Sequence, residues 1–337
     1  MKAAIYMGKE NIEVRELPMP ECGDDDVLIQ NIYSSICGTD VAVYKHGPNT
    51  GHRIDVGGEF GHETISRVIA MGKNVTEFQL GERVYPYPLY AKNDTKRAGT
   101  IGGFSEYILV PQAKRNHSLY EVPENISDRL ACLIEPFTVG CRAARRSQPK
   151  AGEHAIVFGC GTIGLAASVA LKFFGMDKVM VCDLTEYRLD IAKQLGFEVC
   201  NIASENLSAK AEHYFGVAPS LTGQTMDADV FLDAAGAESI LGQFMEHGKI
   251  GSRFVSVAVN NSIRKLDLLH LTYAQKSVIG SGGYFPEDVR DVLEIMSSDR
   301  WELEKMITHE FSIDEIDRAI QTASDSSNSL NVTIRFQ

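Results

Sequence analysis

The pattern of hydrophobic and polar positions divides this chain into two parts. From residue 2 to about residue 120, short runs rich in β-branched and aromatic residues are separated by clusters of Gly, Pro and Asp. Such runs are typical of strands that are joined by turns. They lie at residues 3–6, 27–33, 64–70, 83–87 and 107–110. We therefore expect the first part to form a β-rich, barrel-like domain.

From about Gly152 the pattern changes, and apolar runs are followed by segments with helical periodicity. This alternation predicts a parallel, doubly wound α/β sheet. The predicted strands lie at residues 155–158, 179–182, 230–232 and 254–259. A helical stretch at 286–297 and a β-like segment at 330–336 are too short for a third domain, and we expect them to pack on the first.

Length agrees with two domains, because 337 residues correspond to two units of roughly 100 to 200 residues each. We place the first domain at residues 1–145 and the second at residues 146–283. Residues 284–337 are expected to complete the first domain.

Composition excludes several kinds of partner. The chain has 33 Lys and Arg against 45 Asp and Glu, a net charge of −12, which disfavours nucleic acid and anionic membrane surfaces. Residues 155–171 form the longest run without charge or histidine, but glycines interrupt it and it is shorter than the roughly 18 apolar residues of a membrane span. Residues 1–14 alternate apolar and charged positions, unlike a signal peptide, so we expect a cytoplasmic protein. The seven cysteines have no paired spacing and are expected to be reduced, some of them as metal ligands.

A glycine-rich turn predicts a dinucleotide site. Gly159, Gly161 and Gly164 form a GxGxxG pattern, with Thr162 and Ile163 between the last two glycines. A predicted strand precedes the pattern and a helical segment follows it, which is the setting that the motif requires. The first glycine would make the tight turn, the second would let the backbone approach a pyrophosphate, and the third would allow close packing of the helix.

An acidic residue near this turn indicates the cofactor. Asp183 ends the next predicted strand, where a carboxylate can accept hydrogen bonds from both adenosine ribose hydroxyls and would repel a 2′-phosphate. This favours NAD over NADP, although Arg188 could accommodate the phosphate. The alternative is a glycine turn that binds no nucleotide; strand, helix and acid together argue against it.

Three segments offer ligands for a metal. Cys37 follows a predicted strand, His62 and Glu63 precede another, and Glu135 lies in an apolar segment where a carboxylate needs a partner. Thiolate, imidazole and carboxylate suit zinc, with one position left open for substrate. Taken singly, Cys37 is more typical of a small buried residue and His62 of a hydrogen-bonded turn residue.

These motifs resemble the zinc-dependent medium-chain dehydrogenases. The resemblance runs nearly from end to end and is greatest for the sorbitol, threonine and butanediol dehydrogenase branch. It rests on Cys-Gly-Thr-Asp (37–40), Gly-His-Glu (61–63), Gly-Glu-Arg-Val (81–84), Leu-Ile-Glu-Pro-Phe-Thr-Val-Gly (133–140), Gly-Cys-Gly-Thr-Ile-Gly (159–164) and Asp183. It implies a GroES-like catalytic domain and a Rossmann NAD-binding domain, with zinc and NAD meeting in the cleft.

The resemblance also implies roles for individual residues. Cys37, His62 and Glu63 match the zinc ligands, and Glu135 matches a carboxylate that binds the metal or holds its water and the substrate. Thr39 matches the hydroxyl residue that hydrogen-bonds the reacting alcohol, and Asp40 is expected to support the ligands without touching the metal.

The chain departs from the family pattern in four places. Residues 85–104, where many relatives have four cysteines for a structural zinc, contain none, so we expect one zinc. Ser66 stands at a usual glycine, and Ala42 stands where many relatives have histidine. Tyr284 matches a tyrosine of the substrate domain, but Gly283 replaces the arginine before it, and a few residues are missing after it.

Together these observations predict reversible oxidation of a secondary alcohol to a ketone, on a polyol, sugar alcohol or sugar-derived acid. We expect Thr39 to pass the proton towards solvent, with His46 at the outer end unless it is only an exposed loop residue. The positive cluster at 45–53 is either a solvated loop or a contact for an acid or phosphate group. Candidate walls of the substrate pocket are Tyr44, Phe60, Tyr284 and Phe285.

Two other functions fit parts of the sequence. A zinc-free enzyme of the quinone-reductase type would keep the glycine turn but has no use for Cys37, His62, Glu63 and Glu135 together. A non-catalytic NAD(H) sensor would not need an intact ligand set. The resemblance further implies a homodimer or homotetramer, with the segment around 254–259 and the residues just after it as the contact.

Overall fold

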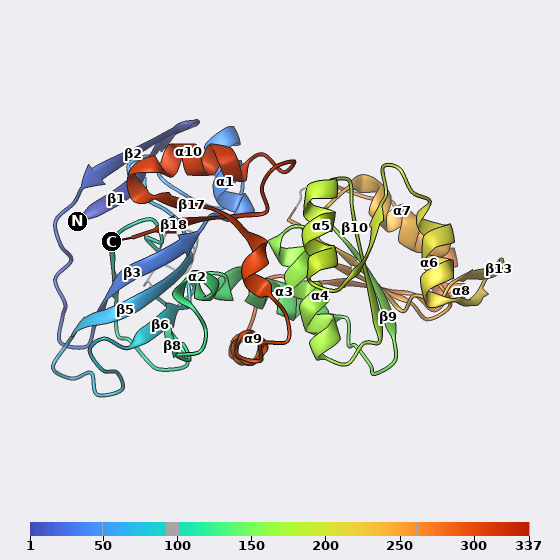
Figure 1. Cartoon of the computed structure of the whole chain (residues 1–337), viewed down its shortest axis with the longest axis horizontal. Helices are drawn as coiled ribbons and strands as arrows, with labels where there is room; N and C mark the ends of the chain where they lie inside the picture. Colours follow the sequence, from blue (N-terminus) through green and yellow to red (C-terminus); the bar gives the residue numbers. More distant parts are fainter. Residues whose placement is uncertain (49, 92–100, 260–261, 337) are drawn as a thin grey trace. The chain divides into compact units, whose positions relative to one another are not determined.

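The structure, a computed structural model, describes residues 1–48, 50–91, 101–259 and 262–336 (Figure 1). The chain divides into two compact units. Unit 1 comprises Met1–Glu135 and Met306–Gln337, and unit 2 comprises Pro136–Lys305. Among the described residues, no helix is long and apolar enough to cross a bilayer.

Unit 1 is built mainly on antiparallel strands, with β17 and β18 as a parallel pair. Its largest sheet has the order β17-β18-β3-β5-β6-β8, with β7 paired to β3, and a smaller sheet has the order β2-β1-β4. The strands are β1 (Lys2–Gly8), β2 (Asn11–Glu16), β3 (Val27–Ser35), β4 (Gly58–Glu59), β5 (Glu63–Met71), β6 (Arg83–Pro86), β7 (Tyr107–Val110), β8 (Leu119–Glu121), β17 (Ile307–Ser312) and β18 (Asn331–Arg335). Each of the five predicted N-terminal strands is found, which confirms the β-rich fold.

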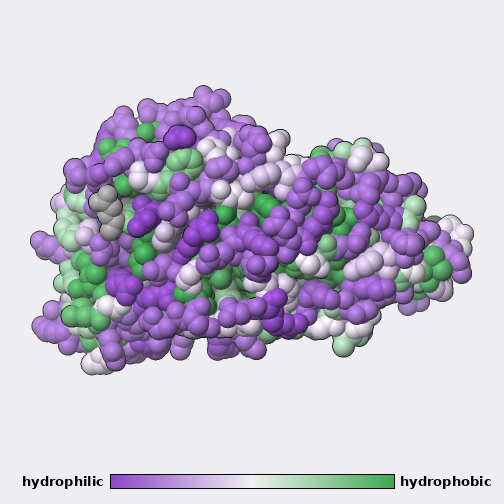
Figure 2. Space-filling model, in the orientation of Figure 1, coloured by the Kyte–Doolittle hydropathy of each residue, from purple (hydrophilic) through white to green (hydrophobic). Residues whose placement is uncertain are grey.

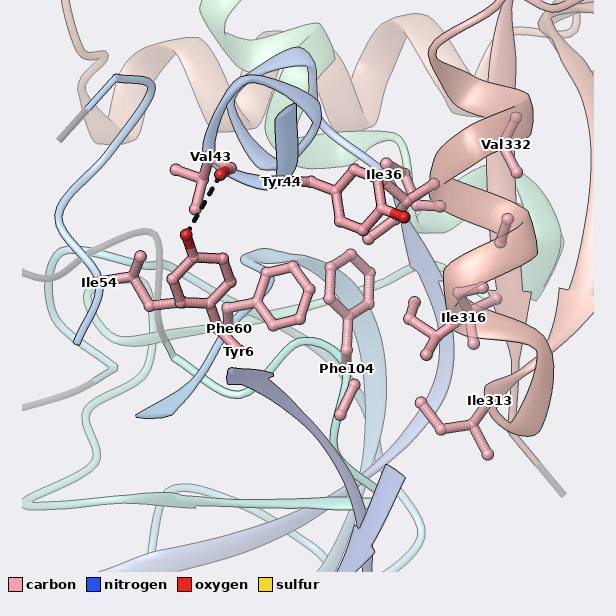
Figure 3. Close-up of a cluster of buried hydrophobic side chains, with 14 of the residues drawn as sticks. Tyr6, Ile36, Val43, Tyr44, Ile54, Phe60, Phe104, Ile313, Ile316 and Val332 are labelled. Atoms are coloured by element: carbon pink, nitrogen blue, oxygen red, sulfur yellow. Dashed lines mark hydrogen bonds between the residues drawn. The ribbon is translucent and has the colours of Figure 1, made fainter. Parts of the chain in front are cut away.

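Two helices of unit 1 cover the hydrophobic cluster that lies beside the candidate site. These helices are α1 (Gly38–His46) and α10 (Ile316–Ala323), and they contact each other. Figure 3 shows the aromatic side chains of Tyr6, Phe60 and Phe104 in one cluster with side chains of α1 and α10. Because burial of aromatic and branched side chains is the main favourable term in folding, this cluster fixes α1 against the sheet. The short helix α2 (Asp128–Ala131) begins with a Ser127 cap.

Unit 2 contains one parallel sheet of six strands in the order β11-β10-β9-β14-β15-β16. The chain moves outward from β9 to β11 and then returns to the other side of β9, so the strand order reverses between β9 and β14. Ligands of such sheets bind at the carboxyl ends of the strands near this reversal. The strands are β9 (His154–Phe158), β10 (Lys178–Asp183), β11 (Glu198–Asn201), β14 (Val230–Asp233), β15 (Arg253–Ser256) and β16 (Ser277–Gly280).

Helices of unit 2 pack on this sheet as the alternating pattern predicts. Helices α4 and α5 contact β9, β10 and β11, and Figure 1 shows both helices next to β10. The helices are α3 (Ile134–Arg146), whose first two residues belong to unit 1, α4 (Thr162–Phe173), α5 (Glu186–Gln194), α6 (Leu207–Phe215), α7 (Glu238–His247), α8 (Leu268–Tyr273) and α9 (Pro286–Ser297), and a hairpin joins β12 (Val217–Ser220) to β13 (Gly223–Met226). The predicted doubly wound α/β sheet is confirmed.

The borders of the two units differ from those placed on the sequence. The structure groups the segment that contains α9 with unit 2, whereas the pattern assigned it to the first domain. The reason is local packing: α9 contacts α4, and its buried Asp288 accepts a 2.8 Å hydrogen bond from Arg145 Nε of α3. Hydrophobic periodicity shows that a helix has an apolar face, but it does not show which unit covers that face.

Candidate functional site

The glycine-rich turn joins β9 to α4 and has the geometry that its sequence predicts. Gly159 has φ +100°, and Gly161 is the N-cap of α4. A Cβ on Gly164 would lie 1.8 Å from the Gly159 carbonyl oxygen, so this position excludes every side chain. Thr162 and Ile163 form the first turn of the helix behind these glycines. The turn thus directs backbone amides and the positive end of a helix dipole outward, the arrangement that binds phosphate.

Asp183 ends β10 beside this turn. Its Oδ2 accepts a 2.7 Å hydrogen bond from Cys160 N, and its Oδ1 accepts bonds from Leu184 N (2.7 Å) and Thr185 N (3.0 Å). Arg188, on α5, places Nη1 3.8 Å from the point that a Cβ on Gly161 would occupy. The predicted acid and the predicted arginine therefore both flank the glycine turn.

A cavity of about 470 Å³ opens at the same edge of the parallel sheet. Phe158 lies in its wall at the end of β9, and Leu184 and Ile202 lie just after β10 and β11. The start of α6 and one face of α7 complete the lining with Glu205, Asn206, Leu207, Ser208, Ser239, Ile240, Gln243 and His247. The lining mixes apolar and polar side chains in similar number, and its volume is in the range of a small-molecule site. These lining residues were not predicted from the sequence, because they come from four separate segments.

The predicted metal ligands of unit 1 converge. Cys37, His62 and Glu63 each offer a ligand atom, and these atoms lie within 4.8 Å of one another. Pairing of β3 with β5 causes this, because it sets Ser35 opposite Glu63 and so brings the end of one strand to the start of the other. His62 and Glu63 are buried. A thiolate, an imidazole and a carboxylate at this spacing fit a zinc ion that keeps an open position.

Asp40 links the segments that carry these ligands. Its buried carboxylate accepts a 3.0 Å hydrogen bond from Cys37 N through Oδ2, and its Oδ1 lies 3.8 Å from His62 Nδ1. Burial raises the pKa of Asp40 to about 6. This geometry agrees with the expected role of Asp40 as a support for the ligands.

Negative charge accumulates in this cluster. Burial raises the pKa of the Cys37 thiol well above its ordinary value, and the charges of Glu63, Asp40 and Glu135 raise it further. Burial also raises the pKa of Glu63. Glu135 is therefore near enough to act on Cys37 and Asp40, although it is outside the group of ligand atoms that lie within 4.8 Å. A bound dication would offset this charge and favour the thiolate, so the donor set fits a metal.

Of the two predicted proton-relay residues, Thr39 lies at the cluster and His46 does not. Thr39 is in the first turn of α1, and its hydroxyl oxygen is buried. His46 is the last residue of the same helix and is exposed. At about 1.5 Å per residue, the helix separates the two by roughly 10 Å along its axis. His46 therefore cannot exchange a proton directly with Thr39.

Another histidine, His52, contacts the residue that supports the ligands. His52 Nε2 lies 3.0 Å from Asp40 Oδ1, and the rings of His52 and His62 are 5.7 Å apart. Burial lowers the pKa of His52 to about 4, so its ring is neutral at pH 7 and Nε2 carries the hydrogen that faces Asp40. The one signal for this residue in the sequence is the positive cluster at 45–53, which does not show that His52 turns inward while His46 is exposed.

Two predicted pocket walls lie in the core of unit 1. Phe60 is fully buried between Tyr6 and Phe104 (Figure 3). Tyr44 is buried in the same cluster, and its hydroxyl donates a 2.8 Å hydrogen bond to Asp317. Because both rings belong to this buried cluster, neither is exposed to a substrate as predicted. Tyr284, in unit 2, is also largely buried, whereas Phe285 is exposed and stacks with Arg142.

Two family models match the chain. The model of the alcohol dehydrogenase GroES-like domain matches residues 23–124, and the model of the zinc-binding dehydrogenase matches residues 162–298. Together they cover most of both units.

Individual proteins give the same result over almost the whole length. The chain is 29% identical to an L-threonine 3-dehydrogenase of Yersinia enterocolitica over 334 residues, 94% of each chain. Its fold is similar to that of 2R,3R-butanediol dehydrogenase from Bacillus subtilis, with a TM-score of 0.85 and 24% identity over 100% of this chain and 99% of that chain. It is also similar to L-idonate 5-dehydrogenase from Escherichia coli, with a TM-score of 0.84 and 19% identity over 99% and 98% of the two chains.

Proposed function

Because this chain belongs to the zinc-dependent medium-chain dehydrogenases, which are oxidoreductases, we propose that it interconverts a secondary alcohol and its ketone with NAD(H). The substrate class is a polyol, sugar alcohol or sugar-derived acid. One observation carries the proposal: Cys37, His62 and Glu63 place three ligand atoms within 4.8 Å of one another in a buried site.

The proposed site holds one zinc ion. The proposed ligands are Cys37, His62 and Glu63. Glu135 is a second carboxylate that either binds the metal directly or holds its water and the substrate. When bound, zinc supplies a Lewis acid that makes an alcohol hydroxyl more acidic near neutral pH. No structural zinc is proposed, because the sequence between 85 and 104 contains no cysteine.

Residues of this chain supply the remaining chemistry. The Thr39 hydroxyl is proposed to hydrogen-bond the reacting hydroxyl, because its oxygen is buried one residue from the Asp40 support and two residues from Cys37. Asp40 keeps the Cys37 and His62 segments together. In the oxidation the carbinol carbon gives a hydride to the nicotinamide ring, and the hydroxyl gives up a proton. We assign no step to His46, since it lies at the far end of α1.

Unit 2 is proposed to bind the cofactor. Gly159, Gly161 and Gly164, with Thr162 and Ile163, would hold the pyrophosphate, and Asp183 would accept hydrogen bonds from the adenosine ribose. Three backbone amides already hold the Asp183 carboxylate in place, so a 2′-phosphate would meet a fixed negative charge. This favours NAD over NADP despite Arg188.

Names of similar proteins support the substrate class. They include dehydrogenases of L-threonine, 2R,3R-butanediol and L-idonate, and each of these compounds has a secondary hydroxyl beside another polar group. We propose a substrate with the same feature. Tyr284 is a proposed substrate contact. Tyr44 and Phe60 are not, because they belong to the buried hydrophobic cluster of unit 1.

The test combines metal analysis with a substrate screen. Purified protein is analysed for metal per chain, and NADH formation is followed over sugar alcohols, sugar acids and 2,3-diols before and after chelation. We expect about one zinc per chain and activity that chelation abolishes and zinc restores. Near-zero metal with undiminished activity would instead identify a zinc-free reductase, and NADH binding without any turnover would identify a sensor.

A homodimer or homotetramer is part of the proposal. Strand β16 is an outer strand of the parallel sheet, and apolar residues near it are exposed: Val259, Ile263, Leu268, Leu269, Tyr273 and Val278. Figure 2 shows hydrophobic atoms on the surface where Figure 1 labels α8. Exposed apolar patches beside a free strand edge favour association. Sedimentation of wild type and of Leu269→Lys tests this, with a smaller species expected for the variant.

A further inference from the structure

A buried polar chain leads from the C-terminal strand to the candidate ligand Glu63. Strand β3 lies between β5 and β18, and its last residue, Ser35, faces Glu63 on one side and Thr333 on the other in the strand register. Asn331 begins β18, two residues before Thr333. The three strands thus bring Ser35, Glu63 and Asn331 together, although Asn331 is almost 300 residues away from Ser35 in the sequence.

Hydrogen bonds connect these three side chains in one direction. Asn331 Nδ2 donates to Ser35 Oγ at 2.9 Å, and Ser35 Oγ donates to Glu63 Oε2. Ser35 is fully buried, and Asn331 and Glu63 are each only 2% exposed. Bulk water therefore does not compete for these bonds.

The direction of the chain follows from its chemistry. Nδ2 of an asparagine can only donate, so the Ser35 oxygen accepts from Asn331 and keeps its single hydrogen for another partner. Glu63 Oε2 is that partner, and a carboxylate is the stronger acceptor. One oxygen of Glu63 is thereby held, which restricts rotation of the carboxylate.

We propose that Ser35 and Asn331 are positioning residues that fix the Glu63 carboxylate as a metal ligand. This rests on the proposed zinc function, which it deepens by naming the groups that orient one ligand. A carboxylate that rotates freely loses entropy when it binds a metal, whereas one held by a hydroxyl is already oriented. Partners of this kind typically change metal affinity by about 10- to 100-fold.

A purely structural role predicts something different. The backbone ladder already joins β18 to β3 and β3 to β5, so the sheet does not depend on the two side chains. If Ser35 served stability alone, its removal would lower the unfolding temperature and leave the metal equilibrium of the folded protein unchanged. Metal affinity therefore separates the two roles.

The experiment measures cobalt and zinc binding to the full-length protein. Metal-free wild type, Ser35→Ala, Ser35→Thr and Asn331→Ala are titrated with Co²⁺ while its visible absorption is recorded, and Zn²⁺ affinity is measured by competition with a chelating dye. Thr333→Val is the matched control, because it removes another buried hydroxyl of the same strands, one that bonds the His309 carbonyl instead of a ligand. Thermal unfolding of each metal-free protein verifies that it folds.

We expect Ser35→Ala to bind both metals about 10- to 100-fold more weakly, with an altered cobalt spectrum. Asn331→Ala should weaken binding in the same direction by a smaller factor, and Ser35→Thr, which keeps the hydroxyl, should bind close to wild type. Thr333→Val should equal wild type. Should Ser35→Ala fail to fold, Asn331→Ala carries the test.

Wild-type affinity and spectrum in both Ser35→Ala and Asn331→Ala would overturn the inference, as would an equal loss in Thr333→Val. If wild type itself bound neither metal, the proposed zinc site would be overturned as well. These results are distinguishable, because the first two leave metal binding by wild type intact.

Discussion

His52 Nε2 lies 3.0 Å from Oδ1 of the buried Asp40, and this contact ties the loop after α1 to the support of the candidate metal ligands. Asp40 Oδ2 accepts a hydrogen bond from Cys37 N, and Asp40 Oδ1 also lies 3.8 Å from His62 Nδ1. His52 thus stabilises the Asp40 carboxylate, which shares a buried space with the carboxylates of Glu63 and Glu135.

Replacing His52 should therefore impair the site, and replacing His46 should not. A hydrogen bond to a charged group contributes about 1.5 to 3 kcal/mol. For His52→Ala we expect kcat/KM to fall by about 10- to 100-fold, together with weaker metal retention. His46→Ala is the matched control, because His46 is exposed at the end of α1, and its kcat/KM should stay within about 2-fold of wild type. The opposite ranking of the two variants would contradict our assignment.

The two candidate carboxylate ligands should differ in effect. Glu63 belongs to the group of ligand atoms within 4.8 Å, whereas Glu135 lies nearby without joining it. Glu63→Ala should therefore lower zinc content to near zero, and Glu135→Ala should weaken metal retention or activity by a smaller amount. Elemental analysis and kcat measure these effects.

Both carboxylate variants should keep wild-type affinity for NADH, since neither residue lies in unit 2. Full wild-type activity in Glu135→Ala would show that our assignment of this residue is wrong.

The glycine turn provides a test of the nucleotide site that leaves the metal ligands untouched. In Gly164→Ala the new Cβ would lie 1.8 Å from the Gly159 carbonyl oxygen, so the turn must move. We expect NADH affinity to fall at least about 100-fold with zinc content unchanged. Fluorescence titration of NADH and elemental analysis measure the two quantities.

Gly242→Ala is the control for this variant. Gly242 lies within α7, and a Cβ there meets nothing within 4 Å. Alanine is favoured over glycine in a helix by about 1 kcal/mol, so this variant should bind NADH normally and unfold at a slightly higher temperature. Loss of NADH binding in both variants would indicate a general effect of substitution rather than a role for the turn.

Asp183 should determine the choice between NAD and NADP. Asp183→Asn removes the negative charge near the ribose position while keeping an oxygen that can accept hydrogen bonds. We expect the ratio of kcat/KM for NADP to that for NAD to rise at least about 10-fold, with Arg188 available to the 2′-phosphate. An unchanged ratio would show that another residue excludes NADP.

Stability should depend on pH through Lys276. This buried side chain donates from Nζ to the carbonyl oxygens of Phe244 (3.1 Å) and Met245 (2.7 Å) at the end of α7. Burial lowers its pKa from 10.5 to about 8, so between pH 8 and 10.5 the unfolded chain binds the proton that the folded chain releases. The free energy of unfolding therefore rises with pH in this interval, by about 1.5 kcal/mol between pH 8 and 9.5.

Urea unfolding of wild type and Lys276→Met at both pH values tests this. The variant has no group at position 276 that titrates, so its free energy of unfolding should lack this rise. If the difference between wild type and variant were the same at pH 8 and pH 9.5, Lys276 would not have the lowered pKa.

Much of the fold was determined by local sequence. Alternating residues specify strands, a 3.6-residue period specifies helices, and the glycine turn between β9 and α4 is a contiguous motif whose geometry depends on neighbouring residues. The candidate ligands Cys37, His62 and Glu63 were also predictable, since each lies next to a strand end and belongs to a recognisable motif.

What the sequence alone did not determine are the contacts between segments that are distant along the chain. It did not show that His52 turns towards Asp40 while His46 faces solvent, or that Tyr44 and Phe60 are covered by α10 and the sheet. The polar chain from Asn331 through Ser35 to Glu63 needs the exact pairing of three strands. The physical reason is that local patterns reflect short-range backbone preferences, whereas these contacts depend on strand register and on which apolar faces meet, and a one-residue shift in register would turn each side chain to the opposite face.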